Sequence, residues 1–143
     1  MRWGLGEAAR HQPGRGGLVM VGMLLGQALV TVALAGALLI WQGQVAAVSA
    51  LLGGLTALVP NAFLAGRLLR AGTGGGGKPL LRAAWVGEIG KLLLTVLLFA
   101  VIFARVRPLE PLAVFGGYIA AQAVIFGALL LGGSGDKRDT TKN

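Results

Sequence analysis

Glu88 and Lys91 lie three residues apart in an otherwise apolar stretch that is long enough to cross a bilayer. A charged side chain in hydrocarbon is costly, by about 3 kcal/mol or more at the bilayer centre, so such residues usually face a protein interior and are candidates for function. At positions i and i+3 of a helix the two side chains share one face. They can therefore form an ion pair, or one of them can pair with a charge on a partner protein.

A second interruption of an apolar stretch is the pair Pro60-Asn61. Proline frees the carbonyl four residues earlier, which belongs to Thr56. Counting inward from the ends of the apolar stretches, at 1.5 Å per residue, places Asn61 and Glu88 at the same depth and brings Lys91 near the Thr56 carbonyl. We therefore predict that Asn61, Pro60, Glu88 and Lys91 form one intramembrane polar cluster.

The two helix faces that carry these residues are small and polar. One face holds Ser49, Gly53, Thr56 and Pro60, and the other holds Ala84, Glu88, Lys91 and Thr95. Membrane helices use such faces to approach each other closely. We expect the two faces to meet, with Gly53, Gly54 and Gly87 as helix-packing residues.

Four apolar runs must position these residues, at 18–41, 45–66, 83–104 and 112–132. Each is long enough, at about 20 residues per span, to cross a membrane as a helix. The chain is 55% hydrophobic and 13% charged, whereas soluble domains carry about 25% charged residues. The sequence predicts an all-α integral membrane protein with four transmembrane helices arranged as two antiparallel hairpins.

The polar segments predict the topology. We divide the chain into a basic N-terminal segment (1–17), a transmembrane domain (18–132) and a polar tail (133–143). The N-terminal segment, the loop after the second run and the tail carry three, four and three Lys or Arg residues, against two in the remaining loop, Arg105 and Arg107. The positive-inside rule then places both termini in the cytoplasm. The net charge of +8 is explained by orientation and attraction to anionic lipid, so no nucleic-acid partner is expected.

Several kinds of chemistry are missing from the sequence. It has no cysteine, no phosphate-binding loop, no nucleophile with a nearby base and no nicotinamide fingerprint. A single carboxylate beside a lysine is a poor divalent-cation site, because Mg²⁺ prefers oxygen ligands and the ammonium group competes. We expect no enzyme activity, no cofactor and no metal site, with Glu88 as a metal ligand only if several copies form a ring of carboxylates.

The order of these features resembles the ATP synthase protein I family, the small four-helix membrane proteins of bacterial ATP synthase operons. The resemblance is carried by 52–55 (Leu-Gly-Gly-Leu), by 58–63 (Leu-Val-Pro-Asn-Ala-Phe), and by Gly87, Glu88 and Lys91. It covers about 40 residues of the second and third runs. The glycine-rich loop and the basic N-terminal segment depart from the family pattern, but they lie outside these motifs.

The resemblance implies a non-enzymatic accessory protein of the F-type ATP synthase in the bacterial plasma (inner) membrane. Such a protein would assist the assembly or stability of the ring of c subunits, which are hairpins with a buried acidic residue. The alternative is translocation of Mg²⁺ or Ca²⁺, which would need a homo-oligomer and would depend on Glu88. A third interpretation, that Glu88 and Lys91 form only a structural ion pair, predicts that substitutions of either residue affect stability alone.

Overall fold

The computed structural model describes residues 14–72 and 77–133. They form four helices: α1 (Gly14–Trp41), α2 (Gln44–Gly72), α3 (Gly77–Arg105) and α4 (Pro111–Gly133). Each contains a stretch long and apolar enough to cross a membrane, which confirms the predicted all-α membrane class. Residues 1–13, 73–76 and 134–143 lie outside the described residues, so the division into segments and the cytoplasmic placement of the termini stay predictions.

The helices are continuous because every backbone polar group in lipid must be bonded within the protein. Accordingly, α2 continues through Pro60 to Gly72. The turn between α1 and α2 is made by Gly43, which has a φ of 93°, a value that glycine adopts without steric cost. The carbonyl of Leu38 accepts the N–H groups of both Gln42 and Gly43, at 2.8 and 3.0 Å.

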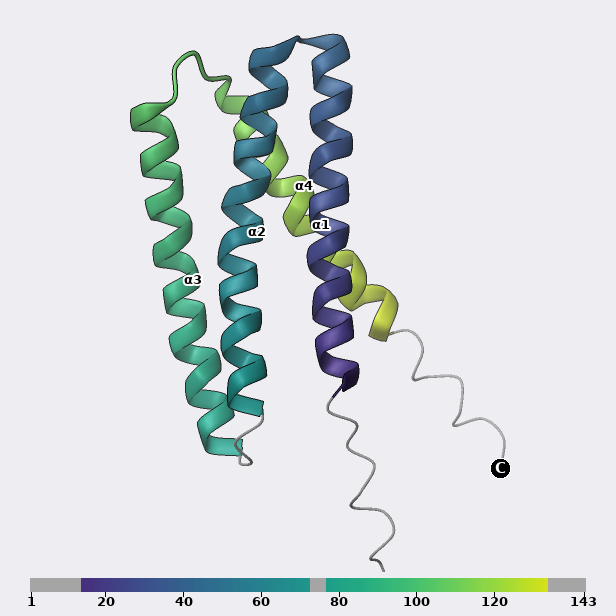
Figure 1. Cartoon of the computed structure of the whole chain (residues 1–143), viewed down its shortest axis with the longest axis vertical. Helices are drawn as coiled ribbons and strands as arrows, with labels where there is room; N and C mark the ends of the chain where they lie inside the picture. The colour runs from purple at the N-terminus through teal and green to yellow at the C-terminus, as the bar shows by residue number, and fades with distance from the viewer. Residues whose placement is uncertain (1–13, 73–76, 134–143) are drawn as a thin grey trace, which may run out of the picture.

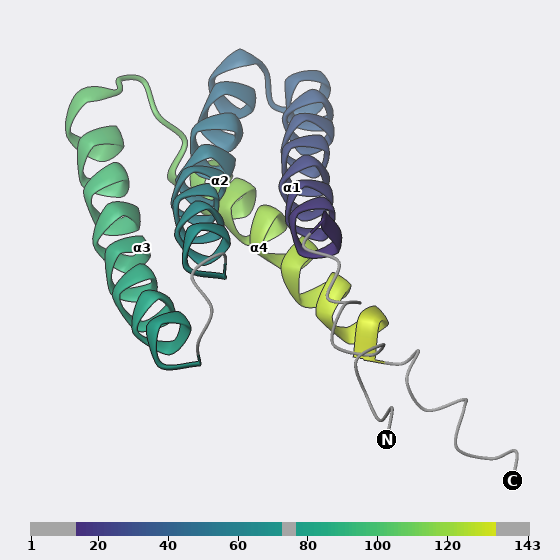
Figure 2. The same ribbon diagram turned by 60° about the horizontal axis from the view of Figure 1, so that its bottom comes forward.

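Helix α2 is the centre of the bundle. Half of its most apolar window is buried within the protein, against 17% for each of the other three helices. Figures 1 and 2 show α2 between α1 and α3, with α4 crossing behind α1 and α2. In the described part of the chain, the backbone of α3 packs closely only on α2, while α4 packs on α2 and α1. This packing does not establish the predicted pair of hairpins, because α4 does not lie along α3.

Small residues let α2 and α4 approach until their backbones touch. A Cβ atom added at Gly53 would collide with the backbone of Val114, and one added at Gly117 would collide with the backbone of Ala50. The two contacts are reciprocal, since each helix presents one glycine to the backbone of the other. Such close approach is typical of membrane helices, where packing and hydrogen bonds replace the hydrophobic effect as the driving force.

The adjacent Gly54 serves a different interface. Its missing Cβ makes room for the side chain of Thr31 on α1. Consecutive residues of a helix point about 100° apart, so Gly53 and Gly54 can face α4 and α1 respectively. Two of the three predicted packing glycines, Gly53 and Gly54, therefore lie at separate helix contacts of α2.

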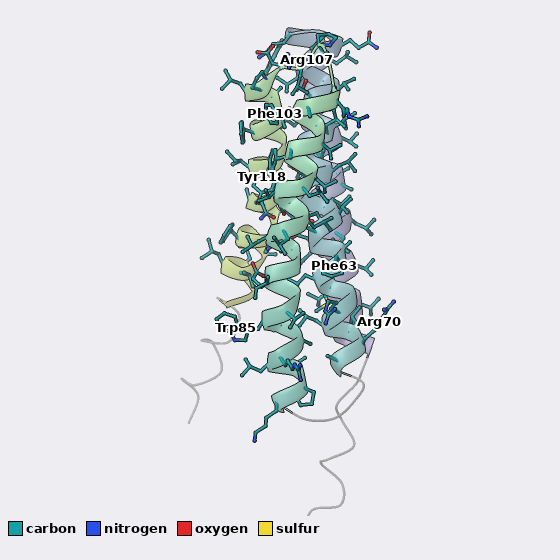
Figure 3. The ribbon with its side chains drawn as sticks, turned by 90° about the vertical axis from the view of Figure 1, so that its left-hand side faces the viewer. Phe63, Arg70, Trp85, Phe103, Arg107 and Tyr118 are labelled. Atoms are coloured by element: carbon teal, nitrogen blue, oxygen red, sulfur yellow. The ribbon has the colours of Figure 1, made fainter. Side chains whose placement is uncertain are left out.

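Aromatic side chains connect α3 to α4 where the backbones do not touch. The ring of Phe99 on α3 lies 5.4 Å from that of Phe115 and 5.3 Å from that of Tyr118, and Phe103 lies 5.9 Å from Phe115. Figure 3 shows that Phe103 and Tyr118 lie well away from Trp85, toward the opposite end of α3. We infer that these rings hold the two helices together near one end of the bundle.

Replacing Phe99 with alanine is expected to loosen α3 from α4. Each aromatic pair contributes about 0.5–1.5 kcal/mol beyond burial, and the change removes two pairs between the helices. Spin labels on cysteines at the exposed positions Val96 and Ile119 should report a broader distance distribution. The chain has no native cysteine to interfere. Phe126→Ala, at an exposed ring of α4, should leave the distribution unchanged; equal broadening in both variants would contradict the role of Phe99.

Candidate functional site

The charged pair on α3 is loose. Lys91 Nζ lies 3.6 Å from Glu88 Oε1, beyond the roughly 2.7–3.2 Å of an N–H···O hydrogen bond. The Glu88 side chain is 51% exposed on the protein surface and that of Lys91 only 18%. The hydroxyl of Thr95 donates to the Lys91 backbone carbonyl at 2.8 Å. Lys91 is thus the more enclosed partner, and the ion pair does not saturate its three N–H donors.

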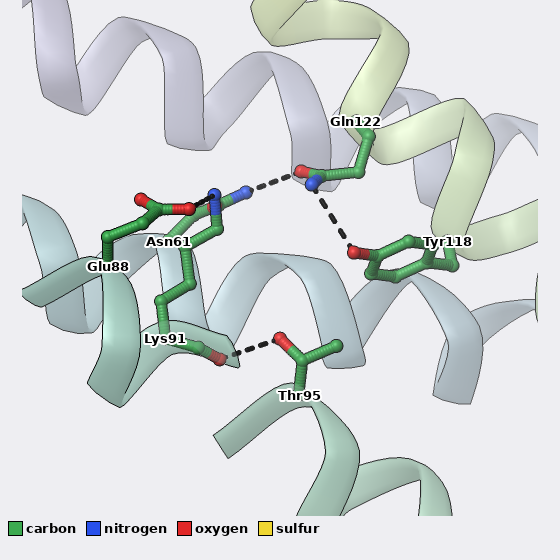
Figure 4. Close-up of polar contacts among 6 residues, drawn as sticks. All are labelled: Asn61, Glu88, Lys91, Thr95, Tyr118 and Gln122. Atoms are coloured by element: carbon green, nitrogen blue, oxygen red, sulfur yellow. Dashed lines mark hydrogen bonds and ion pairs between the residues drawn. The ribbon is translucent and has the colours of Figure 1, made fainter. Parts of the chain in front are cut away.

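A second polar group connects α2 to α4 through amide side chains. Asn61 Nδ2 donates to Gln122 Oε1 at 2.9 Å, and Gln122 Nε2 donates weakly to the hydroxyl of Tyr118 at 3.4 Å. Asn61 is buried. Figure 4 shows these contacts together with the Glu88–Lys91 pair. We call Asn61, Gln122 and Tyr118 the amide chain.

A pocket of about 190 Å³ brings the two groups together. All four helices contribute to its wall, through Gln27 of α1, Asn61 of α2, Lys91 of α3 and Ile125 of α4. The remaining lining is apolar and comes from α1 and α2. A mostly apolar lining with a few polar residues is the usual composition of a binding site, in which the polar groups fix orientation.

Gln27 is the least satisfied polar residue of this pocket. Its side chain is fully buried, and within the described residues neither its amide nitrogen nor its amide oxygen has a hydrogen-bond partner. Its backbone carbonyl accepts a hydrogen bond from the hydroxyl of Thr31 at 2.8 Å, but the side-chain amide takes no part in that contact. Leaving buried polar groups without partners costs about 1–3 kcal/mol. Such a group calls for an explanation, and a ligand group at the pocket would supply one.

The register of α3 along α2 differs from the expected one, which placed Asn61 at the depth of Glu88. A Cβ at Gly87 would lie 2.6 Å from the Leu64 side chain, and one at Gly90 would lie 2.9 Å from the Phe63 ring. These contacts set the register of the two helices and carry Lys91 to the pocket that Asn61 lines. The expected levels were counted from the ends of the apolar runs, which do not fix how far one helix slides along another.

The expected meeting of the two polar faces is wrong. Gly53 packs on Val114 of α4, and the backbone N–H of Glu110, just before α4, donates to the Ser49 hydroxyl at 2.9 Å. The face of α2 that carries Ser49, Gly53, Thr56 and Pro60 is buried, and Ser49 and Gly53 on it contact the α4 side. The physical reason is that Gly53 and Gly117 let the backbones of α2 and α4 touch, whereas Gly87 and Gly90 of α3 face side chains of α2.

The remaining predicted site residues take separate places. Pro60 is buried within the continuous α2 helix. The Thr56 hydroxyl donates to the Gly53 carbonyl at 2.6 Å, while the charged contact of Lys91 is with Glu88. The structure therefore brings Asn61 and Lys91 together at the pocket and leaves Glu88 at the surface beside Trp85. Across residues 14–72 and 77–133, no group of three or more His, Cys, Asp or Glu could hold a metal ion.

Sequence reasoning gave no role to Gln27, Gln122 or Tyr118. The signal was present, because each is a polar residue in an otherwise apolar span and such residues usually face the interior of a bundle. The sequence does not show which helices pack together. That packing decides that Gln122 bonds to Asn61 and that the Gln27 amide bonds to neither of them.

Comparison with known proteins shows the family to which the chain is similar. Residues 22–119 match the family model described as ATP synthase I chain. The chain is 41% identical to ATP synthase protein I of Pseudomonas putida over 91 residues, which cover 64% of this chain and 67% of that protein. It is 40% identical to ATP synthase protein I of Pseudomonas aeruginosa over 111 residues, covering 78% and 88%. No solved structure gives a significant match.

Proposed function

Because the chain belongs to the ATP synthase I chain family, we propose that it is a non-enzymatic accessory protein of the ATP synthase that assists assembly or stability of the c ring. Its four apolar helices and its family make it a multi-pass protein of a bacterial inner membrane. The proposed partners are c subunits within the membrane, and the proposed activity requires no cofactor.

The observation that carries this proposal is the position of Lys91. Its side chain is only 18% exposed, its ammonium group is held only loosely by Glu88, and the residue lines a pocket with mostly apolar walls. A membrane helix that carries a carboxyl group can present that group to Lys91 while its apolar side chains fill the rest of the pocket. The c subunits, with their buried acidic residue, have the chemistry that such a site selects.

The mechanism is an exchange of partners by Lys91. When a partner carboxylate enters, Lys91 moves from Glu88 to the new oxygen, and the unpartnered amide of Gln27, which also lines the pocket, supplies a donor. Glu88 can remain charged only if it moves outward to the lipid headgroups or takes another donor. Leaving one charge buried and unpaired is strongly unfavourable, so the exchange must be concerted.

Asn61 has a supporting role in this exchange. It is bonded to Gln122, which ties α2 to α4 at the level of the pocket. Asn61 therefore holds the α2 and α4 sides of the pocket together. Its amide nitrogen carries two N–H donors, so one N–H is not used in the bond to Gln122. No observation on the described residues favours cation translocation.

Replacing Lys91 with alanine is expected to reduce recovery of c subunit about tenfold, which corresponds to ~1.4 kcal/mol of binding free energy. The test is a pull-down of the tagged full-length protein in mild detergent, with mass spectrometry of the recovered proteins. Leu92→Ala, at an exposed neighbouring position on α3, is the matched control. The amount and elution volume of each purified variant show whether folding is preserved.

Unchanged recovery of c subunit with Lys91→Ala would contradict the exchange mechanism. Reduced stability without any change in recovery would favour a purely structural ion pair. Recovery of this chain alone, as a defined oligomer, would contradict the accessory function and favour a homo-oligomeric role.

A further inference from the structure

A second pocket, of about 660 Å³, lies where α2 ends and α3 begins. Three basic residues line it, Arg67 from α2 and Lys78 and Arg82 from α3. Lys78 and Arg82 are four residues apart and so share one face of α3. The Arg67 guanidinium lies 5.9 Å from the centre of the Phe63 ring, within the range of a cation–π contact. Three cationic groups on two helices thus surround one cavity.

The described lining of the pocket holds no acidic residue that would balance these three charges. Glu88, the nearest acidic residue along α3, is paired with Lys91. The cationic groups are therefore available to an anion. Arginine is well suited to such a ligand, because its planar donors can bind two phosphate oxygens at once.

The apolar part of the pocket points to a lipid. Its other lining residues are Pro79, Ala83 and Val86, which follow one stripe of α3 toward the middle of the helix. Val86 lies about 6 Å deeper than Arg82 along the helix axis. A ligand that fits this order has an anionic group at the helix end and a hydrocarbon chain directed into the bilayer.

The level of the pocket in the membrane agrees with this order. The apolar run 83–104 spans about 30 Å as a helix, which equals the hydrocarbon thickness. Lys78 and Arg82 come just before it, at the level of the lipid phosphates. Trp85 is 67% exposed nearby, as expected of an aromatic residue at the membrane interface.

We propose that Arg67, Lys78 and Arg82 bind the phosphate of an anionic phospholipid, with one acyl chain lying along Ala83 and Val86. Basic pockets between helices on the cytoplasmic side of a membrane bind such headgroups in other proteins. The site is separate from the Lys91 pocket and does not depend on the proposed role in c-ring assembly. A retained lipid here would bridge the end of α2 and the beginning of α3.

The test is native mass spectrometry of the full-length protein, titrated in detergent with phosphatidylglycerol, cardiolipin or phosphatidylcholine. We expect the anionic lipids to bind at least about tenfold more tightly than phosphatidylcholine, since each basic residue near the headgroup contributes about fivefold. The variant Lys78→Gln/Arg82→Gln should lose on the order of tenfold or more in affinity for the anionic lipids. If that variant is not monodisperse, the two single substitutions decide the question, each with a loss of about fivefold.

The matched control is Arg105→Gln/Arg107→Gln, which removes the same charge at the other end of the bundle (Figure 3). It should retain the affinity of the unchanged protein. Equal losses in the two double variants would overturn the site, because binding would then follow net charge alone. Competition by millimolar inorganic phosphate, with no dependence on the acyl chains, would overturn the lipid assignment in favour of free phosphate. Equal binding of all three lipids would overturn both the anion site and its assignment to an anionic lipid.

Discussion

Gly117→Ala is expected to remove most of the folded protein, whereas Gly116→Ala, one residue earlier, leaves it unchanged or slightly more stable. The added methyl group at 117 would collide with the carbonyl of Ala50 on α2, while a methyl group at 116 meets nothing within 4 Å. Forcing atoms into a packed core costs about 1–3 kcal/mol, occasionally more. A backbone carbonyl cannot move aside as a side chain can, so we expect the upper part of that range or beyond.

The neighbouring substitution isolates this effect. Glycine inside a helix is less favourable than alanine by about 0.5–1 kcal/mol, so Gly116→Ala gains helix propensity without a clash. The measurement is the fraction of protein that stays monodisperse in detergent after heating through a series of temperatures. Equal behaviour of the two variants would show that α2 and α4 do not approach as closely as the structure indicates.

The reciprocal contact, between Gly53 and Val114, provides an independent test of the close approach of α2 and α4. Gly53→Ala should behave like Gly117→Ala, because its methyl group would meet the backbone of Val114. Gly66→Ala, on the same helix with nothing within 4 Å, should behave like Gly116→Ala. Loss of folding at 53 and 117 alone would locate the critical packing between α2 and α4.

The four helices could be predicted from the sequence because the bilayer sets their length. A run of about 20 apolar residues has only one stable arrangement in hydrocarbon, in which each backbone group bonds within its own helix. The charged pair was equally predictable, since Glu88 and Lys91 are neighbours on any helix. In both cases the interactions are local along the chain.

The pairing of the helices could not be predicted in the same way. Small residues occur on several faces of α2, and the sequence does not show which neighbour uses each face. Gly53 was assigned to α3 but contacts α4, because Gly117 offers that helix a closer approach. The register of α3 likewise follows from Gly87 and Gly90. This choice among interfaces also decides that Asn61 bonds to Gln122.

Gln27→Leu is expected to raise the stability of the protein by about 1 kcal/mol or more, because it removes a buried amide that has no partner. Leucine has a similar volume and fills the same space among apolar neighbours. The matched substitution Gln122→Leu should have the opposite sign. It would leave Asn61 Nδ2 without the acceptor that it now contacts at 2.9 Å, and hydrogen bonds between membrane helices contribute about 0.6–2 kcal/mol.

The two Gln→Leu variants also separate stability from function. If the Gln27 amide serves a partner carboxyl group, Gln27→Leu should recover less c subunit although the protein itself is more heat-resistant. The heating series used for the glycine variants, followed by the pull-down used for Lys91→Ala, measures both quantities on the same preparations. A destabilised Gln27→Leu would show that the amide has a partner after all. Increased stability with full recovery of c subunit would remove Gln27 from the binding site and leave Lys91 as its polar contact.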